Sequence, residues 1–169
     1  MTAAAPDSMP DGTASPIHRL VVLRHAAADY HFDGPDRERP LTLDGEHTAL
    51  ARGRQLGQAL TAVDRLLVSP AVRTRQTAAM AMPDGPDPTF LEGIYEASAG
   101  DLIRVLEASG AGCTMLVGHN PGLSDLASVL TGQRESLAPG DALILSVTDP
   151  DAGPLQPSSA AVLERLVEI

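Results

Sequence analysis

Short runs of aliphatic residues alternate along this chain with longer segments of helical periodicity, and this alternation limits the fold more than any other feature. The pattern predicts strands over residues 19–23, 65–69, 89–91, 113–118 and 142–147, with a last strand within 161–167. It predicts helices over residues 44–62, between Pro70 and Pro83, over 98–108 and over 121–130. Strands that alternate with helices form βαβ units, whose helices cover both faces of a sheet. We therefore expect an α/β fold, a three-layer αβα sandwich with a mostly parallel sheet.

Two local patterns refine this expectation. In the first predicted helix Asp44 is placed to cap the N-terminus, and one face carries Ala49, Gly53, Leu56 and Leu60. At the end of the chain, two predicted strands are separated by the turn "DPDAG". These two strands could form an antiparallel pair, which would make the sheet mixed.

The length of 169 residues suits one well-buried domain. Residues 1–16 are rich in Ala, Pro, Asp and Ser and show no periodicity. They predict a disordered N-terminal tail, followed by a single domain over residues 17–169. The chain has two Phe, two Tyr and no Trp, so the core is expected to be aliphatic.

Charge and residue usage exclude several classes of function. All twelve basic residues are arginine, which excludes a P-loop lysine and a Schiff-base lysine. The net charge of −10 argues against nucleic acid as a partner. A lone cysteine, Cys113, permits no internal disulfide and is expected to be buried and inert. No apolar stretch reaches membrane-spanning length and no signal peptide is recognisable, so we expect a cytoplasmic protein without membrane contacts.

Three predicted strands end in the same way, with a polar group directly after the aliphatic run. The endings are "LVVLRH", "LLVSPAVR" and "MLVGHNP", which supply Arg24 with His25, Ser69 with Arg73, and His119 with Asn120. Ligands of open α/β sheets bind outside the carboxyl ends of the strands. The sequence therefore predicts that two histidines and two arginines meet at one edge of the sheet.

Such a set of side chains suits a phosphoryl group. Arginine pairs bidentately with phosphate oxygens, and a neutral histidine can attack phosphorus and carry the phosphoryl group covalently. A second histidine can donate hydrogen bonds as charge develops on the oxygens. With two arginines and His119 supplying the positive charge, no metal and no other cofactor are expected.

The motifs "LRHA", "VSPAVRTRQT" and "LVGHNPGL" resemble those of the histidine phosphatase superfamily, and "RPLTLDG" is similar to the segment that follows its Arg–His motif. Their order and spacing, and the short chain, resemble the small SixA-type phosphohistidine phosphatases, so the resemblance implies a phosphoglycerate mutase-like fold. It also implies that His25 is the phosphorylated nucleophile, that Arg24 and Arg73 bind the phosphate, and that His119 completes the pocket. Asn120 is expected either to cap a helix or to contact the substrate.

The sequence departs from the family pattern in two places. The family usually has glycine after the Arg–His pair, where this chain has Ala26, and alanine would be strained if the backbone required positive φ. The family's general acid is not clearly marked: Glu92 and Glu96 are both candidates, and we favour Glu96.

Several residues keep a second interpretation. Ser69 suits the role of a phosphate ligand and the role of a turn residue equally well. Arg75 is expected to be solvated, whereas Arg37 or Arg39 could steer an anionic substrate. A metal site at Asp29, His31 and Asp33 matches no known ligand spacing, and we do not expect one.

The expected function is that of a phosphatase that works through a phosphohistidine intermediate. By resemblance, the favoured substrate is phosphohistidine on a protein. A small phosphorylated metabolite on the same machinery is the alternative substrate. A module that binds phosphorylated ligands without catalysis is the alternative from another class.

Overall fold

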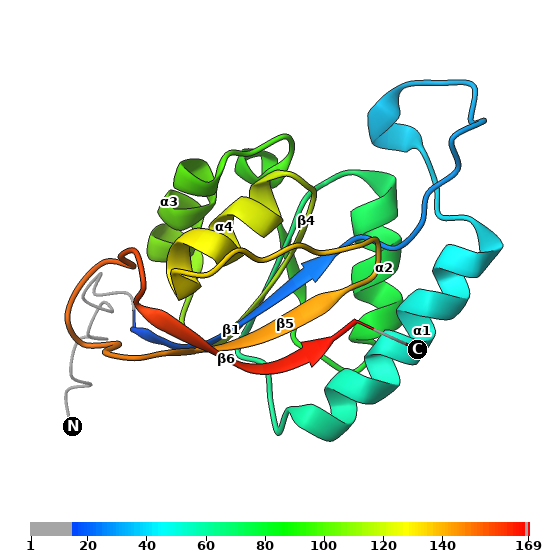
Figure 1. Cartoon of the computed structure of the whole chain (residues 1–169). Helices are drawn as coiled ribbons and strands as arrows, with labels where there is room; N and C mark the ends of the chain where they lie inside the picture. The colour runs from blue at the N-terminus through cyan, green and yellow to red at the C-terminus, as the bar shows by residue number, and fades with distance from the viewer. Residues whose placement is uncertain (1–14, 168) are drawn as a thin grey trace, which may run out of the picture.

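The computed structural model describes residues 15–167 and 169, and within them one sheet lies between two pairs of helices (Figure 1). The strands are β1 (Ile17–Arg24), β2 (Arg65–Val68), β3 (Pro88–Phe90), β4 (Gly112–Gly118), β5 (Ala142–Val147) and β6 (Ala160–Leu166). The helices are α1 (Leu43–Ala59), α2 (Val72–Ala81), α3 (Ala99–Ser109) and α4 (Gly122–Thr131). Two short 3-10 turns, η1 (Asp36–Glu38) and η2 (Glu92–Ile94), lie in the connections before α1 and α3.

The strand order is β3-β2-β4-β1-β5-β6. Neighbours from β3 to β1 run parallel, whereas β5 is antiparallel to both β1 and β6. The predicted mixed, mostly parallel sheet in a three-layer sandwich is thereby confirmed. Because β2, β4 and β1 are adjacent and parallel, their carboxyl ends lie side by side at one edge.

Strand β1 shows why the sheet needs cover on both faces. Leu20 and Val22 pack with α3 and α4, whereas Val21 and Leu23 pack with α1 and α2. All four side chains are fully buried, and each such burial contributes about 1.5–3 kcal/mol. A strand with helices on both faces reads as a continuous aliphatic run, which explains the sequence "LVVL".

The structure corrects two local predictions. Helix α1 is capped by Thr42, whose hydroxyl accepts a hydrogen bond from the Gly45 amide at 3.0 Å, and not by Asp44. Asp44 lies in the first turn instead, where a carboxylate is favourable because of the helix dipole. Cys113 is only half-buried, because it stands near the amino end of β4.

Most of the predicted disordered tail, residues 1–14, lies outside the described residues. In the part of the chain that the structure describes, no helix combines the length and the apolar character needed to cross a membrane.

Candidate active site

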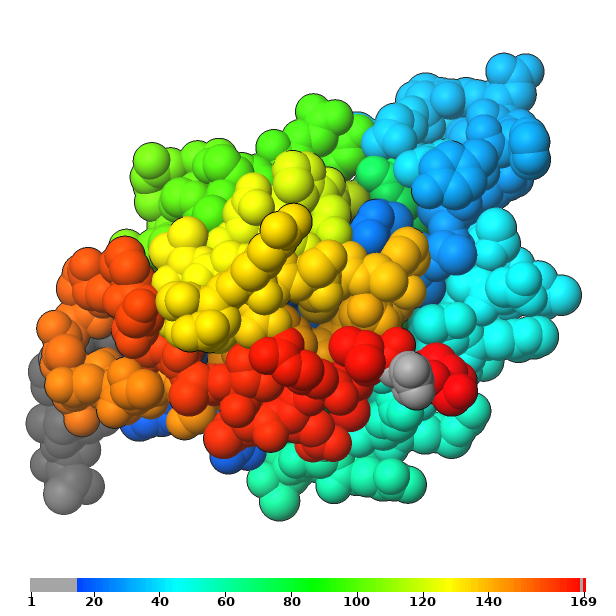
Figure 2. Space-filling model, in the orientation of Figure 1, coloured from blue at the N-terminus to red at the C-terminus, as the bar shows by residue number. Residues whose placement is uncertain are grey.

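The carboxyl ends of β1, β4 and β2 bring His25, His119 and Ser69 together. The ring centroids of His25 and His119 are 5.3 Å apart, and His119 Nε2 lies 2.7 Å from the Ser69 hydroxyl. In Figure 2 the blue atoms at the end of β1 reach the surface between the light-blue loop before α1 and the yellow and orange segment that leads into β5. The predicted meeting of three strand ends is therefore what the structure shows.

The hydrogen bond of His25 determines which of its ring nitrogens carries the proton. Its Nδ1 lies 2.8 Å from the carbonyl oxygen of Ala26. Because a carbonyl only accepts, Nδ1 carries the proton and Nε2 keeps its lone pair. The side chain is 8% exposed, and burial, together with the positive charges of nearby arginines, lowers the pKa of His25 to about 4. The ring is therefore neutral at neutral pH and able to attack phosphorus.

The positive charges of three arginines lower the pKa of His25. Arg24 donates through Nη1 to the carbonyl of Leu137 at 2.9 Å, and Arg73 donates through both terminal nitrogens to Asp36, at 2.8 and 3.0 Å. Arg39 also lies near enough to lower the pKa of His25. Arg24 and Arg73 are the arginines that the strand ends predicted, whereas Arg39 was expected only to steer the substrate.

The same residues hold the polar atoms that lack partners. Among the described residues, the buried side-chain nitrogens and oxygens with no hydrogen-bond partner are Arg24 Nε, Arg39 Nε, Arg73 Nε and His119 Nδ1. An unpaired buried polar group costs about 1–3 kcal/mol. That these atoms all belong to groups around His25 indicates a site built for an oxyanion.

His119 contributes a hydrogen bond to this set and no charge in the free protein. Burial, followed by the nearby charge of Arg73, lowers its pKa to about 3. The expectation that His119 supplies positive charge is therefore wrong for the free protein. When Ser69 donates to Nε2, the proton of His119 lies on Nδ1, the unpaired atom that could donate to an oxyanion. This contact assigns Ser69 an orienting role.

Ala26 replaces the expected glycine without backbone strain. Among the described residues other than glycine, positive φ occurs only at Glu96 and Ser158, so the family glycine is not required here for its conformation. Ala26 is fully buried, and its amide donates to the Thr77 hydroxyl at 3.1 Å. Thr77 in turn donates to the carbonyl of Arg73 at 2.7 Å, which links the His25 loop to helix α2.

The segment "RPLTLDG" packs α1 onto the loop after His25. The Thr42 amide donates to the carbonyl of Ala27 at 2.9 Å, and Thr42 also caps the helix. A Cβ at Gly45 would lie 2.1 Å from that same carbonyl oxygen. The close approach requires glycine, and this explains why the motif accompanies the Arg–His pair.

Asn120 acts as a structural link. Its amide nitrogen donates to the carbonyl of Leu137 at 2.8 Å, and its oxygen accepts from the Ser124 amide and hydroxyl. Both ends of the amide are thus engaged within the protein. The N-cap residue of α4 is Pro121, and Asn120, one residue earlier, satisfies an amide of the first turn from there. A contact between Asn120 and the phosphate stays a prediction.

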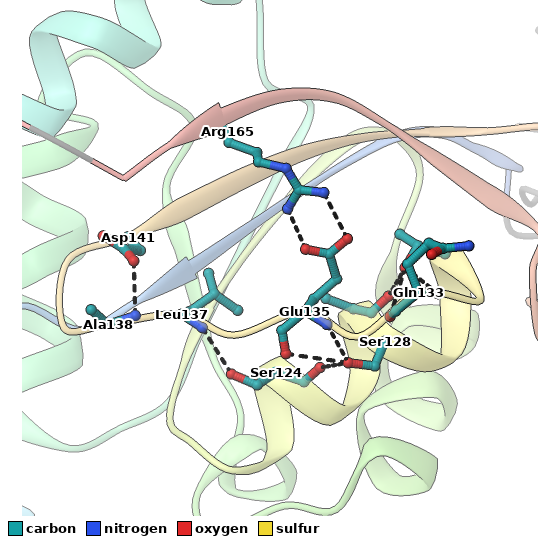
Figure 3. A network of polar contacts seen from close by, with 10 residues as sticks. Ser124, Ser128, Gln133, Glu135, Leu137, Ala138, Asp141 and Arg165 are labelled. Carbon is teal, nitrogen blue, oxygen red and sulfur yellow. Dashed lines mark hydrogen bonds and ion pairs between the residues drawn. The ribbon is translucent and has the colours of Figure 1, made fainter.

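Figure 3 shows how the segment that carries Leu137 is held. The Leu137 amide donates to the Ser124 hydroxyl at 3.1 Å, and the Glu135 amide donates to the Ser128 hydroxyl at 2.9 Å. The Glu135 carboxylate, buried in the protein, forms a bidentate pair with Arg165 of β6. These contacts fix the carbonyl that orients Arg24.

Replacing Ser124 by alanine is expected to lower kcat/KM for an aryl phosphate by about tenfold, because a misplaced catalytic group is costly even when the misplacement is small. The change removes the hydroxyl that holds the Leu137 amide, and Arg24 loses its fixed carbonyl. Steady-state kinetics measures the effect. Ser136→Ala, at an exposed position next to Leu137, is the matched control, and an equal loss in both variants would contradict the positioning role.

The segment before α3 presents Tyr95 to the site rather than a glutamate. The Tyr95 ring meets His119 edge-on, with centroids 5.5 Å apart, and its hydroxyl donates to Asp36 at 2.7 Å. Glu92 is exposed and pairs with Arg37, which lowers the pKa of this carboxyl. Glu96 is exposed, with φ of 53°, and its role as general acid stays a prediction.

Other residues singled out in the sequence make contacts of their own. Arg37 is engaged by Glu92, and exposed Arg75 donates to the carbonyl of Pro70 and stacks on Phe90. Asp29 accepts a hydrogen bond from the backbone amide of His31 within a local turn. Within the described residues, no group of three or more His, Cys, Asp or Glu side chains is arranged to hold a metal ion.

The lowered pKa of His25 predicts the acid limb of the rate profile. The free-enzyme value appears in kcat/KM. For an aryl phosphate, after correction for the ionisation of the substrate, the inflection is expected near pH 4, below the ordinary histidine value of 6.5. An inflection at the ordinary value would contradict the neutral, buried His25.

The same groups predict how stability depends on pH. Below pH 6.5 the unfolded chain binds protons that folded His25 and His119 do not bind, because their folded pKa values are lower. The stability that both contribute is complete above 6.5 and is lost as the pH falls toward about 4 and about 3. Thermal midpoints measured from pH 7.5 downward should show this loss, and it should be smaller in a His119→Gln variant.

The chain is similar to several known proteins. The model of the histidine phosphatase superfamily (branch 1) matches residues 20–108. An uncharacterized protein of Mycobacterium tuberculosis is 39% identical over 110 residues, which span 64% of this chain and 69% of that protein. A phosphohistidine phosphatase SixA homolog of Haemophilus influenzae is 28% identical over 133 residues, or 70% and 80% of the two chains. The structure of a candidate phosphohistidine phosphatase SixA from Nakamurella multipartitia superposes with a TM-score of 0.75 at 26% identity, covering 88% of this chain and 94% of that one.

Proposed function

Since the chain belongs to the histidine phosphatase superfamily, we propose that it is a phosphatase that forms a phosphohistidine at His25 and acts on phosphohistidine carried by a protein. The proposal assigns phosphate binding to Arg24 and Arg73, with His119 as a hydrogen-bond donor. It involves no metal ion, and chelator treatment is therefore expected to leave the rate unchanged.

The reaction proceeds in two displacements. Nε2 of His25 attacks phosphorus in line, the bond from phosphorus to the leaving group breaks, and its electron pair goes to the leaving atom. Water then attacks the phosphorylated His25, the P–N bond breaks, and its electron pair returns to Nε2. The products are inorganic phosphate, after loss of a proton, and the original neutral His25. Arg24 and Arg73 offset the charge of the phosphoryl oxygens in both steps.

The observation that carries the proposal is the set of unpaired nitrogens around a neutral histidine. Arg24 Nε, Arg73 Nε and His119 Nδ1 are buried and lack partners, while His25 presents a free lone pair. Donors for an oxyanion and a nucleophile thus converge, as phosphoryl transfer to histidine requires.

Two points support a protein-borne phosphohistidine as the substrate. The Haemophilus relative bears the name of a phosphohistidine phosphatase homolog. A protonated imidazole also leaves phosphorus without a strong general acid, and both candidate glutamates are exposed at the surface. A reaction that needs little acid assistance suits this arrangement.

The proposal is tested by comparing turnover of a histidine-phosphorylated protein with turnover of an aryl phosphate. We expect a kcat/KM at least about 10²-fold higher for the phosphoprotein, because binding energy and the leaving group both favour it. A preference for small phosphorylated metabolites would support the alternative substrate class. Retained phosphate binding without any turnover would contradict the proposal and indicate a binding module.

A further inference from the structure

Asp36 of η1 lies against the phosphate-binding residues. Its carboxylate accepts hydrogen bonds from Arg73 Nη2 at 3.0 Å and from the Tyr95 hydroxyl at 2.7 Å, and Arg39 Nη2 is 3.3 Å away. Its backbone carbonyl accepts from Arg73 Nη1 at 2.8 Å. An acidic side chain thus stands beside a site whose other charged members are arginines.

The Asp36 carboxylate is ionised at neutral pH and gives the site a negative charge. The hydrogen bond from Tyr95, with those from Arg73, lowers the pKa of Asp36. Its negative charge also acts on His119, whose ring is edge-on to Tyr95. Asp36 is therefore within electrostatic reach of a group bound between the two histidines.

The leaving group is expected on the exposed side of the site, where Asp36 also lies. In-line attack places the leaving atom opposite Nε2 of His25. His25 is 8% exposed, whereas the Asp36 side chain is 50% exposed. The leaving group is therefore expected to point outward, within electrostatic reach of Asp36, which is hydrogen-bonded to Arg73 and Tyr95. A bidentate pair between Arg37 and Glu92 holds the segment that carries Asp36 against η2.

We propose that Asp36 is a specificity-determining residue: its carboxylate favours substrates whose leaving group carries a positive charge and disfavours those whose leaving group carries a carboxylate. The inference rests on the proposed function and deepens it. A phosphorylated imidazole protonated on its second nitrogen fits this requirement. When its P–N bond breaks, the electron pair moves to the ring, which leaves as neutral imidazole while the phosphoryl group passes to His25.

Two other roles for Asp36 make different predictions. If Asp36 only occupied Arg73 in competition with phosphate, its removal would raise kcat/KM for every substrate alike. If it only positioned Arg73 and Tyr95, its removal would lower kcat/KM for every substrate alike. Selection by charge changes the ratio between substrates instead.

The test compares Asp36→Asn with the unaltered protein on three small substrates. They are phosphoimidazole, an aryl phosphate whose aryl group carries no charge, and phosphoglycolate, whose leaving group bears a carboxylate. We expect kcat/KM to fall about tenfold for phosphoimidazole, to rise severalfold for phosphoglycolate and to change less than threefold for the aryl phosphate. Asp36→Glu should keep the original order of preference. Asp33→Asn removes the same charge from an exposed position of the same loop and should change no ratio.

Unchanged ratios in an active Asp36→Asn variant would overturn the role of Asp36 and leave the proposed function standing. A parallel rise or a parallel fall for all three substrates would overturn it as well. If the unaltered protein turned over none of the three and formed no phosphoenzyme, the proposed function and this inference would both fail.

Discussion

Replacing His25 by alanine is expected to lower kcat/KM for an aryl phosphate by at least about 10⁴-fold, because the covalent route disappears with the nucleophile. The neighbouring arginines and His119 would still bind phosphate. The variant should therefore bind inorganic phosphate with little change while it forms no phosphoenzyme. Steady-state kinetics and phosphate titration measure the two effects separately.

His47→Ala is a suitable control for this experiment. His47 is exposed on α1, away from the strand ends, and its replacement is expected to leave the rate unchanged. Residual activity of His25→Ala within tenfold of the unaltered protein would show that another group attacks phosphorus. Far-ultraviolet circular dichroism verifies that the variant is folded.

Arg73 is expected to have the second-largest effect. Arg73→Gln should lower kcat/KM by about 10³-fold, because the developing charge on the phosphoryl oxygens loses a buried guanidinium. Arg73→Lys should lose about 10²-fold, since lysine keeps the charge but not the planar fork. The KM of the glutamine variant should rise as its kcat falls, because phosphate binds through this group in the ground state as well.

Arg75→Gln provides the matched control, two residues along the same helix. Arg75 is exposed and packs on Phe90, so its loss should change kcat/KM by less than threefold. Similar losses at Arg73 and Arg75 would indicate a general effect of net charge, and would contradict a specific role for Arg73.

The elements of the fold were accessible from sequence because each is encoded locally. The run 142–147 was predicted with the bounds that the structure shows, and the suggested antiparallel pairing with the last strand is observed between β5 and β6. The cap of α1 was not predicted correctly. Thr42 and Asp44 both suit a cap, and the contact that decides between them joins Thr42 to Ala27 of another segment.

The residues of the candidate site likewise divide into those that local sequence marks and those that depend on contacts between distant segments. Arg24 ends β1, His25 and His119 directly follow β1 and β4, and Arg73 lies in the first turn of the helix after β2. Their convergence could be predicted because parallel strands share an edge. Asp36 could not be found in this way, because its partners Arg73 and Tyr95 are 37 and 59 residues away in the chain. The orientation of Arg24 depends on a backbone carbonyl, at Leu137, and no residue type marks such a group.

The question raised by Ala26 shows where a family pattern needs a structure. Sequence comparison marks the missing glycine as a departure, but only the backbone tells whether a positive φ was needed. Ala26 has no such requirement, and its side chain packs with Leu41 and Ala49. His25 can therefore keep its hydrogen bond to the Ala26 carbonyl.

The central claim is that His25 carries the phosphoryl group. The most direct test incubates the protein with a phosphohistidine-bearing protein labelled at phosphorus and then quenches the reaction without acid. The account predicts a label on this chain that is stable to base and labile to acid, located at His25 by mass spectrometry and absent from His25→Ala. A label on another residue, or one that persists in His25→Ala, would contradict it.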